Sequence, residues 1–396
     1  MTRIYADNAA TTKISQTAMA AMISAMENTY GNPSSLHRIG MEANGALQSA
    51  REQISRCIGC MPKEIYFTSG GTESDNQAIL SAAVLGERKG KKHILSTRFE
   101  HHAVLHTLEK LEKQGFEIQL LEVGEEGMVT AEQVEKAIRP DTCLVTVMSA
   151  NNEVGSVLPI GEIGAVCRER GVLFHTDAVQ AVGHIPVNVK EQNIDLLSFS
   201  AHKFHGPKGI GVLYARRGTE LTSLMEGGGQ ERGKRPGTEN VPAIMGMAAA
   251  LKEACARMEE TGKAVAAMRN RLIEGLLQVP HCILNGSRLR RLPGNVNFCF
   301  EGVEGESLLL LLDGKGICAS SGSACASGAL DPSHVLLALG RPYEIAQGSL
   351  RLTLDERNTE EEIDYMLQEI PRVIEYLRKM SPEWQEKQSG EKKFLL

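Results

Sequence analysis

The chain has 396 residues, of which 42% are hydrophobic and 23% are charged, and its formal net charge is -6 at pH 7. This acidic balance provides no global positive field, so we expect no stable nucleic-acid partner. The longest purely aliphatic run, at 308–312, is far too short for a membrane span, so we expect neither a membrane partner nor a signal peptide.

The length and the cysteine content set two further expectations. A chain of this length fits roughly two domains, with ample material for a core. The nine cysteines are an odd number and lack the spacing of a disulfide framework. We therefore expect a globular protein of the reducing cytoplasm.

The first motif that could bind a ligand follows a predicted strand at 65–68. The polar run at 7–12, taken alone, indicates only a helix cap and a turn. After 65–68, the segment 69–74 contains Gly71 and Thr72 and turns into a helix at 76–85. Free N–H groups and the positive end of a helix dipole would attract a phosphate there. A plain capped helix explains this segment equally well, and only a phosphate-bearing cofactor would favour the anion site.

Three histidines stand at the start of the next helix, after a predicted strand at 94–97. His102 and His106 have the i, i+4 spacing of a zinc site, but the Glu of a His-Glu-x-x-His motif is missing and no other ligand cluster is evident. We therefore predict no metal site. The flat ring of His101 is better suited to stacking on a cofactor, if one binds.

Strands and helices then alternate along the chain. Apolar runs predict strands at 118–123, 144–148, 172–176, 196–200 and 210–214, and helical patterns lie between them at 131–138 and 160–170. This alternation is typical of a largely parallel sheet wrapped by helices. Asn152 follows one of these strands and falls at the same carboxyl-terminal edge as the residues considered next.

A lysine and an aspartate end two of these strands. Lys203 closes the run Ser200-Ala201-His202-Lys203, and Asp177 belongs to the run 175–180, which also contains Gln180. A lysine just past a strand is by itself more often a surface residue. Ligands of open α/β sheets gather at these strand ends, however, and the pair offers an amine for an aldehyde and a carboxylate for a pyridinium nitrogen. These are the groups that pyridoxal 5'-phosphate (PLP) requires.

The segment 228–234 matches the start of a nucleotide-binding P-loop. Arg235 stands where Ser or Thr should hold magnesium, and Pro236 prevents the helix from starting normally. We interpret this segment as a flexible loop, in which Arg235 and Thr238 can contact an anion.

The last third of the chain has an α+β pattern. A helical stretch at 241–277 ends before Pro280. Short strands at 296–300 and 350–354 then alternate with helices at 307–312, 332–339 and 361–377. The polar segment after Pro382 is predicted to be a mobile tail.

A loop of small residues at 316–328 contains Cys325. Small residues pack weakly, so a cysteine there is a candidate reactive thiol, whereas a structural thiol would lie among large apolar neighbours. The alternative is a Ser/Gly linker that carries an incidental cysteine. The Cys57-x-x-Cys60 pair, without a second such pair, is interpreted as packing at a helix end.

Together these motifs closely resemble those of the cysteine desulfurases, which are class V, fold type I PLP enzymes. The resemblance runs from 7–12 to the helix ending near Met380, and 320–325 is similar to the catalytic-cysteine motif of the branch that serves nitrogenase and iron–sulfur assembly. It implies an α/β fold with a mainly parallel seven-stranded sheet flanked by helices, plus a smaller α+β C-terminal domain. The large PLP-binding domain would comprise 15–260. The small domain would comprise 1–14 and 261–380 and carry the cysteine loop, and 381–396 would form the tail.

The resemblance assigns a role to each motif around the cofactor. Lys203 would bind PLP as a Schiff base, Asp177 would pair with the pyridinium nitrogen, Gln180 would bond the phenolate oxygen, and His101 would stack on the ring. The residues that would hold the phosphate are Gly71, Thr72, Ser200 and His202, together with Thr238 from the second subunit of a homodimer.

The resemblance also implies a reaction. Asn152, Arg351 and Asn8 would bind the substrate L-cysteine, with Arg351 suited to its carboxylate. Lys203 would remove the α-proton, and the Cys325 thiolate would attack the substrate sulfur, leaving a persulfide and L-alanine. His101 is a candidate for activating this thiol, whose ordinary pKa lies near ~8.5.

Partners and alternatives follow from the same motifs. The sulfur acceptor would be an iron–sulfur scaffold protein or another thiolation partner. On a scaffold protein, Cys325 would transiently contact the iron–sulfur cluster. Selenocysteine lyase, an aminotransferase and a catalytically silent scaffold are the alternatives. A second nucleophile such as Cys325 favours sulfur transfer over transamination, and the presence of Lys203 and Asp177 argues against a silent scaffold.

Overall fold

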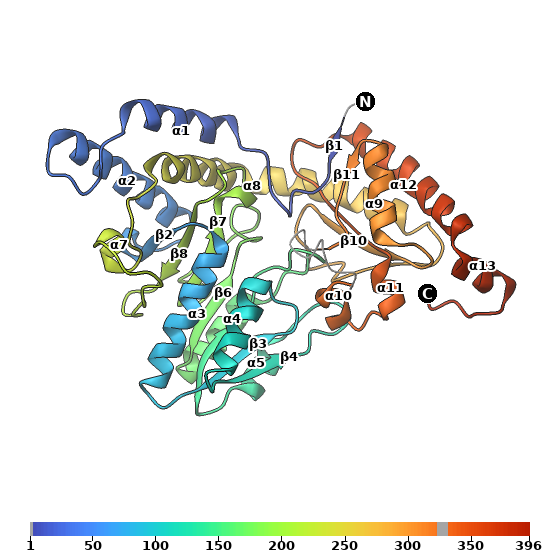
Figure 1. Cartoon of the computed structure of the whole chain (residues 1–396), viewed down its shortest axis with the longest axis horizontal. Helices are drawn as coiled ribbons and strands as arrows, with labels where there is room; N and C mark the ends of the chain where they lie inside the picture. Colours follow the sequence, from blue (N-terminus) through green and yellow to red (C-terminus); the bar gives the residue numbers. More distant parts are fainter. Residues whose placement is uncertain (1–2, 323–331) are drawn as a thin grey trace.

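A seven-stranded sheet forms the centre of the larger part of the molecule. The computed structural model describes residues 3–322 and 332–396 (Figure 1). The strand order is β2-β8-β7-β6-β5-β3-β4, and only β8 runs antiparallel to its neighbours. The bounds are β2 (Ile65–Thr68), β8 (Gly211–Ala215), β7 (Leu196–Ser200), β6 (Leu173–Asp177), β5 (Thr142–Thr146), β3 (His93–Thr97) and β4 (Glu117–Leu121). The prediction of a mainly parallel seven-stranded sheet is confirmed.

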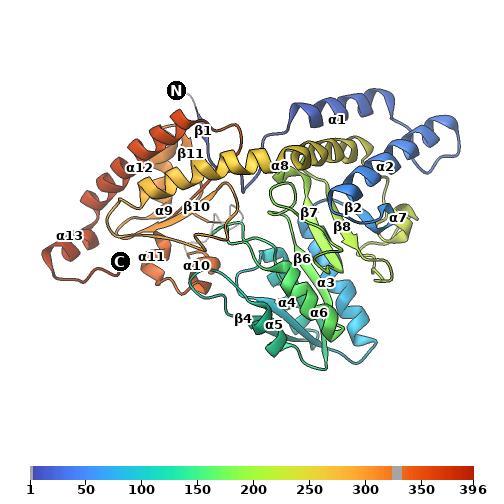
Figure 2. The ribbon, with the colours of Figure 1, turned by 180° about the vertical axis from the view of Figure 1, so that it is seen from behind.

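Helices cover both faces of this sheet. Helix α3 (Gly71–Glu87) covers the face seen in Figure 1, and α6 (Ile160–Arg170) covers the face seen in Figure 2. Buried strands such as β7, in which all five residues are buried, are the consequence of this double cover. The other helices of this part are α1 (Gln16–Asn28), α2 (Arg38–Cys57), α4 (His102–Glu112), α5 (Ala131–Ala137) and α7 (Gln230–Gly233), with the 3-10 turns η1 (Pro62–Glu64) and η2 (Ala201–Lys203).

One long helix, α8 (Val241–Leu276), joins the two parts of the molecule. Its 36 residues span about 54 Å. Side chains from Ala243 to Leu251 belong to the core cluster under the large sheet, whereas those from Val265 to Leu276 belong to a second cluster that contains the small sheet. The boundary near 260 therefore falls inside a continuous helix, and the division into domains remains a prediction.

The second part is built on two small sheets. Strands β12 (Ser349–Thr353), β10 (Asn295–Phe300) and β9 (Cys282–Leu284) form an antiparallel sheet in that order. The N-terminal strand β1 (Ile4–Tyr5) pairs in parallel with β11 (Ile317–Cys318). The helices here are α9 (Gly305–Gly314), α10 (His334–Ala338), α11 (Tyr343–Gln347), α12 (Glu360–Met380) and α13 (Pro382–Ser389). Among the described helices, none combines the length and the apolar character needed to cross a bilayer.

The C-terminal segment packs against the small sheet, which differs from the predicted mobile tail. The carboxylate of Glu301, directly after β10, accepts hydrogen bonds from Lys387 Nζ at 2.7 Å, from Leu395 N at 2.8 Å and from Leu396 N at 3.0 Å. The ring of Phe394 stacks on His281 with centroids 3.9 Å apart. A buried acceptor about ninety residues away along the chain thus holds a segment whose own composition is polar.

Candidate active site

Most of the predicted cofactor and substrate residues meet at one cavity of about 200 Å³. The cavity lies where β6 and β7 end and α3 begins. Ten of the predicted residues line it: Gly71, Thr72, His101, Asn152, Asp177, Gln180, Ser200, His202, Lys203 and Arg351. The chain therefore brings together segments more than 250 residues apart in sequence, as the strand-end argument predicts.

Lys203 ends the 3-10 turn η2, which directly follows β7. Its Nζ atom donates hydrogen bonds to the carbonyl oxygens of Ala9 at 2.6 Å and Ala10 at 2.9 Å. Its own carbonyl oxygen accepts a bond from His184 Nε2 at 2.8 Å. The N-terminal segment 7–12, which looks like a simple turn in the sequence, thus forms one wall of the cavity and contacts the lysine.

Asp177 ends β6, the parallel neighbour of β7. Its Oδ1 atom accepts a hydrogen bond from Val179 N at 2.9 Å. Burial raises the pKa of this carboxyl to about 6, and the hydrogen bond from Val179 and the charge of Lys203 act in the opposite direction. A cationic partner inside the cavity would therefore strongly stabilise the ionised form of this carboxyl.

A second carboxylate, Asp75 on α3, lines the same cavity and was missed by the sequence analysis. It is 1% exposed, and its Oδ1 atom lies 3.6 Å from His175 Nε2 and has no hydrogen-bond partner among the described residues. Burial and the nearby charge of Asp177 raise the pKa of Asp75 well above its ordinary value. Its position, four residues after Gly71 on the inner face of the helix, is the signal that could have revealed it.

His175 lies on β6 and faces Asp75. Its Nδ1 atom lies 2.7 Å from Thr146 Oγ1, and its Nε2 atom lies 3.0 Å from Ser198 Oγ. Burial lowers the pKa of His175 to about 3, so the ring is neutral. His175 lies outside the lining of the cavity, and its two hydrogen bonds fix the ring that faces Asp75 at 3.6 Å.

The N-terminus of α3 opens into the cavity at a turn that requires glycine. Gly70 has φ +156° and caps the helix without a side-chain hydrogen bond. A Cβ atom added at Gly71 would lie 2.6 Å from Val179 Cγ2, so the backbone approaches the wall closely here. Thr72 and Ser200 add hydroxyl groups to the cavity lining. Together these groups are suited to binding an anion.

Arg351 reaches the cavity from β12 of the small sheet and is 1% exposed. Its Nη2 atom donates to Asp7 Oδ1 at 2.9 Å, and its Nη1 atom donates to the carbonyl oxygen of Asn152 at 3.2 Å. The Nε atom has no hydrogen-bond partner among the described residues. A buried guanidinium with a donor to spare is suited to binding a carboxylate.

His101 caps α4 and faces the same cavity. Its Nδ1 atom accepts a hydrogen bond from Ala103 N at 3.1 Å, so the ring hydrogen is on Nε2. Burial and then the charge of Lys203 lower the pKa of His101 to about 4. The ring is therefore neutral near pH 7 and a weak base.

The structure does not bring every predicted residue to the cavity. Asn8 is absent from its lining, and its Nδ2 atom donates to the carbonyl oxygen of Thr353 at 2.9 Å. Thr238 is exposed in the loop before α8, and Arg235 in the same loop pairs with Glu73 at 2.9 Å. Cys325 lies outside the described residues.

The segment that resembles a P-loop has a structural explanation. Glu231 within it is 5% exposed, and its carboxylate forms two hydrogen bonds with the guanidinium of Arg51, at 2.6 and 2.9 Å. It also accepts a hydrogen bond from Phe67 N at 3.0 Å. The segment is thus anchored to α2 through a buried ion pair and to β2 through the hydrogen bond from Phe67, and it does not form the backbone cradle of a nucleotide site.

Comparison with known proteins identifies the family. The family profile described as aminotransferase class V matches residues 4–366. A cysteine desulfurase IscS of Methanosarcina thermophila is 52% identical over 379 residues, which cover 96% of this chain and 94% of that protein. The chain belongs to the cysteine desulfurases of the class V aminotransferase family.

Solved structures agree with this membership. A structure described as a NifS-like protein superimposes with a TM-score of 0.88 at 39% identity and covers 94% of this chain and 100% of that one. Another, described as SspA in complex with cysteine, has a TM-score of 0.80 at 36% identity and covers 90% and 100% of the two chains. The fold of this cysteine desulfurase is therefore that of PLP enzymes of fold type I.

The cofactor of the enzyme is PLP, and the donor set of the cavity fits it. The cavity offers an amine at Lys203 for the aldehyde and a buried carboxylate at Asp177 for the ring nitrogen. The N-terminus of α3 is a suitable site for a phosphate. The lining of this cavity would therefore offer a suitable partner to each of the aldehyde, the ring nitrogen and the phosphate of PLP.

Proposed function

We propose that this desulfurase removes sulfur from L-cysteine and transfers it to Cys325, releasing L-alanine. The observation that carries the proposal is the convergence of Lys203, Asp177 and Arg351 on one cavity. The amine and the carboxylate suit PLP, and the guanidinium suits the carboxylate of an amino acid. The structure titled SspA in complex with cysteine, which covers 90% of this chain, supports the choice of substrate.

We assign the cofactor contacts as follows. Lys203 would bind the aldehyde, Asp177 would pair with the ring nitrogen, and Gln180 would bond the phenolate oxygen. Bound PLP supplies an electron sink for the bonds to the substrate α-carbon. The residues proposed to hold the phosphate are Gly71, Thr72, Ser200 and His202, with Thr238 reaching over from a second subunit.

Arg351 and Asn152 are proposed to position the substrate. The spare Nε donor of Arg351 and its link to the Asn152 carbonyl support a role in holding the substrate carboxylate. Asn8 lies one residue before the Ala9 carbonyl that Lys203 contacts, and a role for it would be to hold this wall through Thr353. These contacts would fix the α-carbon above the amine.

Lys203 is proposed to move the α-proton. Two carbonyl oxygens hold its ammonium group in the cavity, so a proton taken up at Nζ is stabilised where it forms. His101, whose pKa is lowered to about 4, is a weak base at pH 7. We therefore assign His101 to stacking on the cofactor and to donation from Nε2–H, and we do not assign it the activation of the thiol.

Cys325 is proposed to receive the sulfur. Its thiolate attacks the substrate sulfur, the S–S bond of the persulfide forms, and the carbon–sulfur bond breaks. The electron pair of that bond stays with the carbon, which is then protonated to give L-alanine. An acceptor thiol or a reductant then takes the terminal sulfur from Cys325. An iron–sulfur scaffold protein or another thiolation partner is the proposed acceptor.

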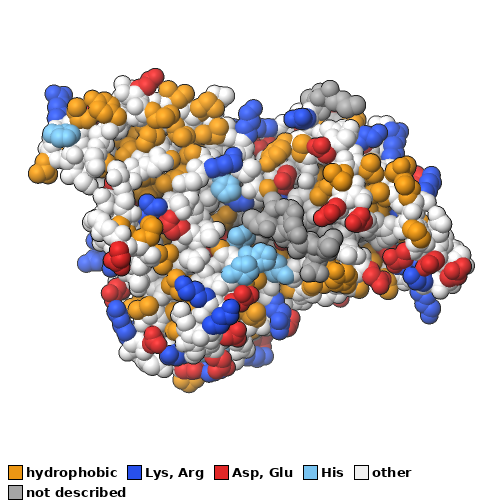
Figure 3. Space-filling model, in the orientation of Figure 1, with side chains coloured by type: hydrophobic (Ala, Val, Ile, Leu, Met, Phe, Trp, Pro, Cys, Tyr) orange, Lys and Arg blue, Asp and Glu red, His pale blue; other side chains and the backbone are white. Residues whose placement is uncertain are grey.

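We also propose a homodimer in the cytoplasm. Exposed apolar side chains gather over α1 and α2 (Figure 3). They are Ile23, Met26, Tyr30, Leu36, Ile39 and Met41. We propose that a second copy of the chain covers this face, and that its Thr238 contributes to the phosphate site. The eight described cysteines are all free, which is consistent with a reducing compartment.

Release of alanine from L-cysteine in the presence of a reductant tests the function. The unaltered enzyme is expected to release alanine, and Cys325→Ala and Lys203→Ala are expected to release none while remaining folded. Alanine released by Cys325→Ala at the unaltered rate would overturn the assignment of the nucleophile. Absence of alanine from the unaltered, PLP-loaded enzyme would overturn the substrate, and selenocysteine and other amino acids would then be compared.

A further inference from the structure

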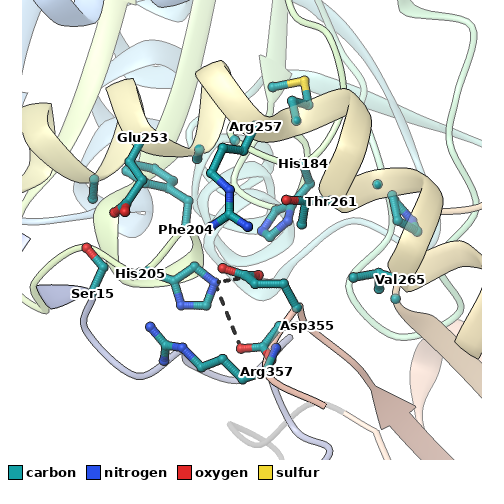
Figure 4. Close-up of a pocket in the computed structure, with 18 of the residues that line it drawn as sticks. Ser15, His184, Phe204, His205, Glu253, Arg257, Thr261, Val265, Asp355 and Arg357 are labelled. Atoms are coloured by element: carbon teal, nitrogen blue, oxygen red, sulfur yellow. Dashed lines mark hydrogen bonds and ion pairs between the residues drawn. The ribbon is translucent and has the colours of Figure 1, made fainter. Parts of the chain in front are cut away.

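A second cavity, of about 370 Å³, lies between α8 and the segments that follow η2 and β12 (Figure 4). Its wall carries His205 from the first of these segments and Asp355 and Glu356 from the second. One ligand atom from each of the three side chains lies within 4.8 Å of the other two. Figure 4 shows His205 and Asp355 facing each other across this cavity. Neither the proposed reaction nor its cofactor uses this cluster.

The imidazole of His205 is held with one nitrogen directed at the carboxylates. Its Nδ1 atom lies 3.0 Å from the carbonyl oxygen of Lys13, which can only accept, so Nδ1 carries the hydrogen. The backbone of His205 has φ +63°, and it is fixed by hydrogen bonds to Thr12 Oγ1 at 2.8 Å and from Ser15 N at 2.9 Å. In metal sites, a hydrogen bond from one imidazole nitrogen to a backbone carbonyl oxygen commonly orients the histidine, so that its other nitrogen faces the ion.

The distances across the cluster suit a shared ion. His205 Nε2 lies 3.5 Å from Glu356 Oε2 and 3.9 Å from Asp355 Oδ2. Hydrogen bonds of this kind are about 2.7–3.2 Å long, so both distances are too long for one. Two ligand atoms that are each about 2.1 Å from one ion are separated by about 3.0–4.2 Å.

The other charged groups of the cavity leave these atoms accessible. Asp355 uses only Oδ1, which accepts from Arg357 N at 2.9 Å, and the guanidinium of Arg357 donates to the Lys13 carbonyl at 2.9 Å. Glu253 accepts from Thr17 Oγ1 at 3.0 Å. Arg257 extends from α8 towards the cavity and forms no ion pair or hydrogen bond with the described residues (Figure 4). Glu356 is exposed and can adjust its position.

We propose that His205, Asp355 and Glu356 bind a divalent transition-metal ion, with water in the remaining positions. One imidazole and two carboxylates suit Mn²⁺, Fe²⁺ or Zn²⁺ better than a soft ion such as Cu⁺. His205 lies two residues after Lys203, and Asp355 lies four residues after Arg351. The ion would therefore join the segment of the catalytic lysine to that of the arginine, and so link the two parts of the molecule.

Binding of Mn²⁺ to the PLP-loaded enzyme, followed by electron paramagnetic resonance, tests the site. Mn²⁺ is the suitable probe because it prefers oxygen and nitrogen to the thiols of the nine cysteines. We expect one tight Mn²⁺ per chain in the unaltered enzyme and an affinity at least about 10-fold lower in Glu356→Gln and His205→Asn. Glu253→Gln, in the same cavity but outside the cluster, is the matched control and is expected to bind as the unaltered enzyme does.

The nitrogen coupling of the bound Mn²⁺ provides a second readout. A ¹⁴N coupling in the unaltered enzyme that is lost in His205→Asn would identify the imidazole as a ligand. Equal Mn²⁺ binding by the unaltered enzyme and Glu356→Gln would overturn the site and leave a simple ion pair between His205 and Glu356. Because Glu356 is exposed, its variant folds and decides the question even if His205→Asn does not fold.

Discussion

Asp75 and Asp177 are two buried carboxylates on the wall of one cavity, and burial together with the charge of Asp177 raises the pKa of Asp75. Two such groups cannot both be ionised at low cost in a site removed from water. Asp75 is the more fully buried, at 1% exposure against 4% for Asp177. We therefore expect Asp75 to remain protonated while Asp177 ionises to meet a cation in the cavity.

Without PLP, the enzyme is expected to lose stability as the pH rises through the pKa of Asp177. The folded pKa is about 6, against an ordinary value of 3.8, so the folded state holds a proton that the unfolded state has released. The contribution of the Asp177 carboxyl to the free energy of unfolding is fully present below pH 3.8 and is lost as the pH rises to about 6. The loss is at most about 3 kcal/mol. Thermal unfolding of PLP-free protein and of Asp177→Asn at pH 4 to 8 measures it.

Asp177→Asn provides the control for this pH dependence. Asn cannot ionise, so the variant is expected to be more stable than the unaltered PLP-free enzyme above pH 6 and to lose alanine production. PLP should remove the difference in pH dependence, because a cation then faces Asp177. If the two PLP-free proteins lost stability in parallel between pH 4 and 7, the raised pKa of Asp177 would be wrong.

Arg351→Lys is expected to raise the KM for L-cysteine by at least about 10-fold, with a smaller effect on kcat. Lysine keeps the charge but lacks the fork that contacts Asp7 and Asn152 while leaving a donor for the substrate. Steady-state alanine release measures both constants. Arg357→Lys, a nearby arginine whose Nη1 donates to a backbone carbonyl, serves as the control. An unchanged KM in Arg351→Lys would remove Arg351 from substrate binding.

Glu301→Gln is expected to destabilise the fold by about 1.5–3 kcal/mol, because it removes a charge-assisted hydrogen bond from the buried ammonium of Lys387, which then keeps only Glu383, at 3.0 Å, as a charged partner. The side chains of this pair are 1% and 3% exposed. Lys392→Ala breaks the pair with Glu386, whose side chains are 55% and 42% exposed, and should cost about 1 kcal/mol or less. Urea unfolding compares the two. Equal effects would show that the C-terminal segment contributes no stability through Glu301.

The sheet and most of the cavity could be predicted because short stretches of sequence define the strands and the residues that end them. Lys203 and Asp177 each end an apolar run, and parallel strands necessarily place such ends at one edge. Strand β7 was predicted with its observed bounds, since 196–200 is a continuous buried run. The predicted bounds of β5 were shifted by two residues, because Thr142 and Cys143 are buried without being strongly apolar.

Contacts between distant segments could not be predicted in this way. Nothing in the local sequence shows that the carbonyl of Ala9 meets Lys203, or that Glu301 binds the last two residues of the chain. The cluster of His205 and Asp355 could not be predicted for the same reason. The two residues are 150 positions apart, in short polar segments that only the fold brings together. Such pairs depend on tertiary packing, which leaves no periodic signal in the sequence.

The most direct test is the mass of the peptide that contains Cys325 after a brief reaction with L-cysteine and rapid alkylation. We predict one extra sulfur atom on Cys325 in the PLP-loaded enzyme and none in Lys203→Ala. No Lys or Arg separates Cys318 from Cys325, so both lie in one tryptic peptide, and fragmentation of this peptide should place the extra sulfur on Cys325 and none on Cys318. Extra sulfur on another cysteine, or alanine release with no extra sulfur on Cys325, would show that Cys325 is not the residue that receives the sulfur.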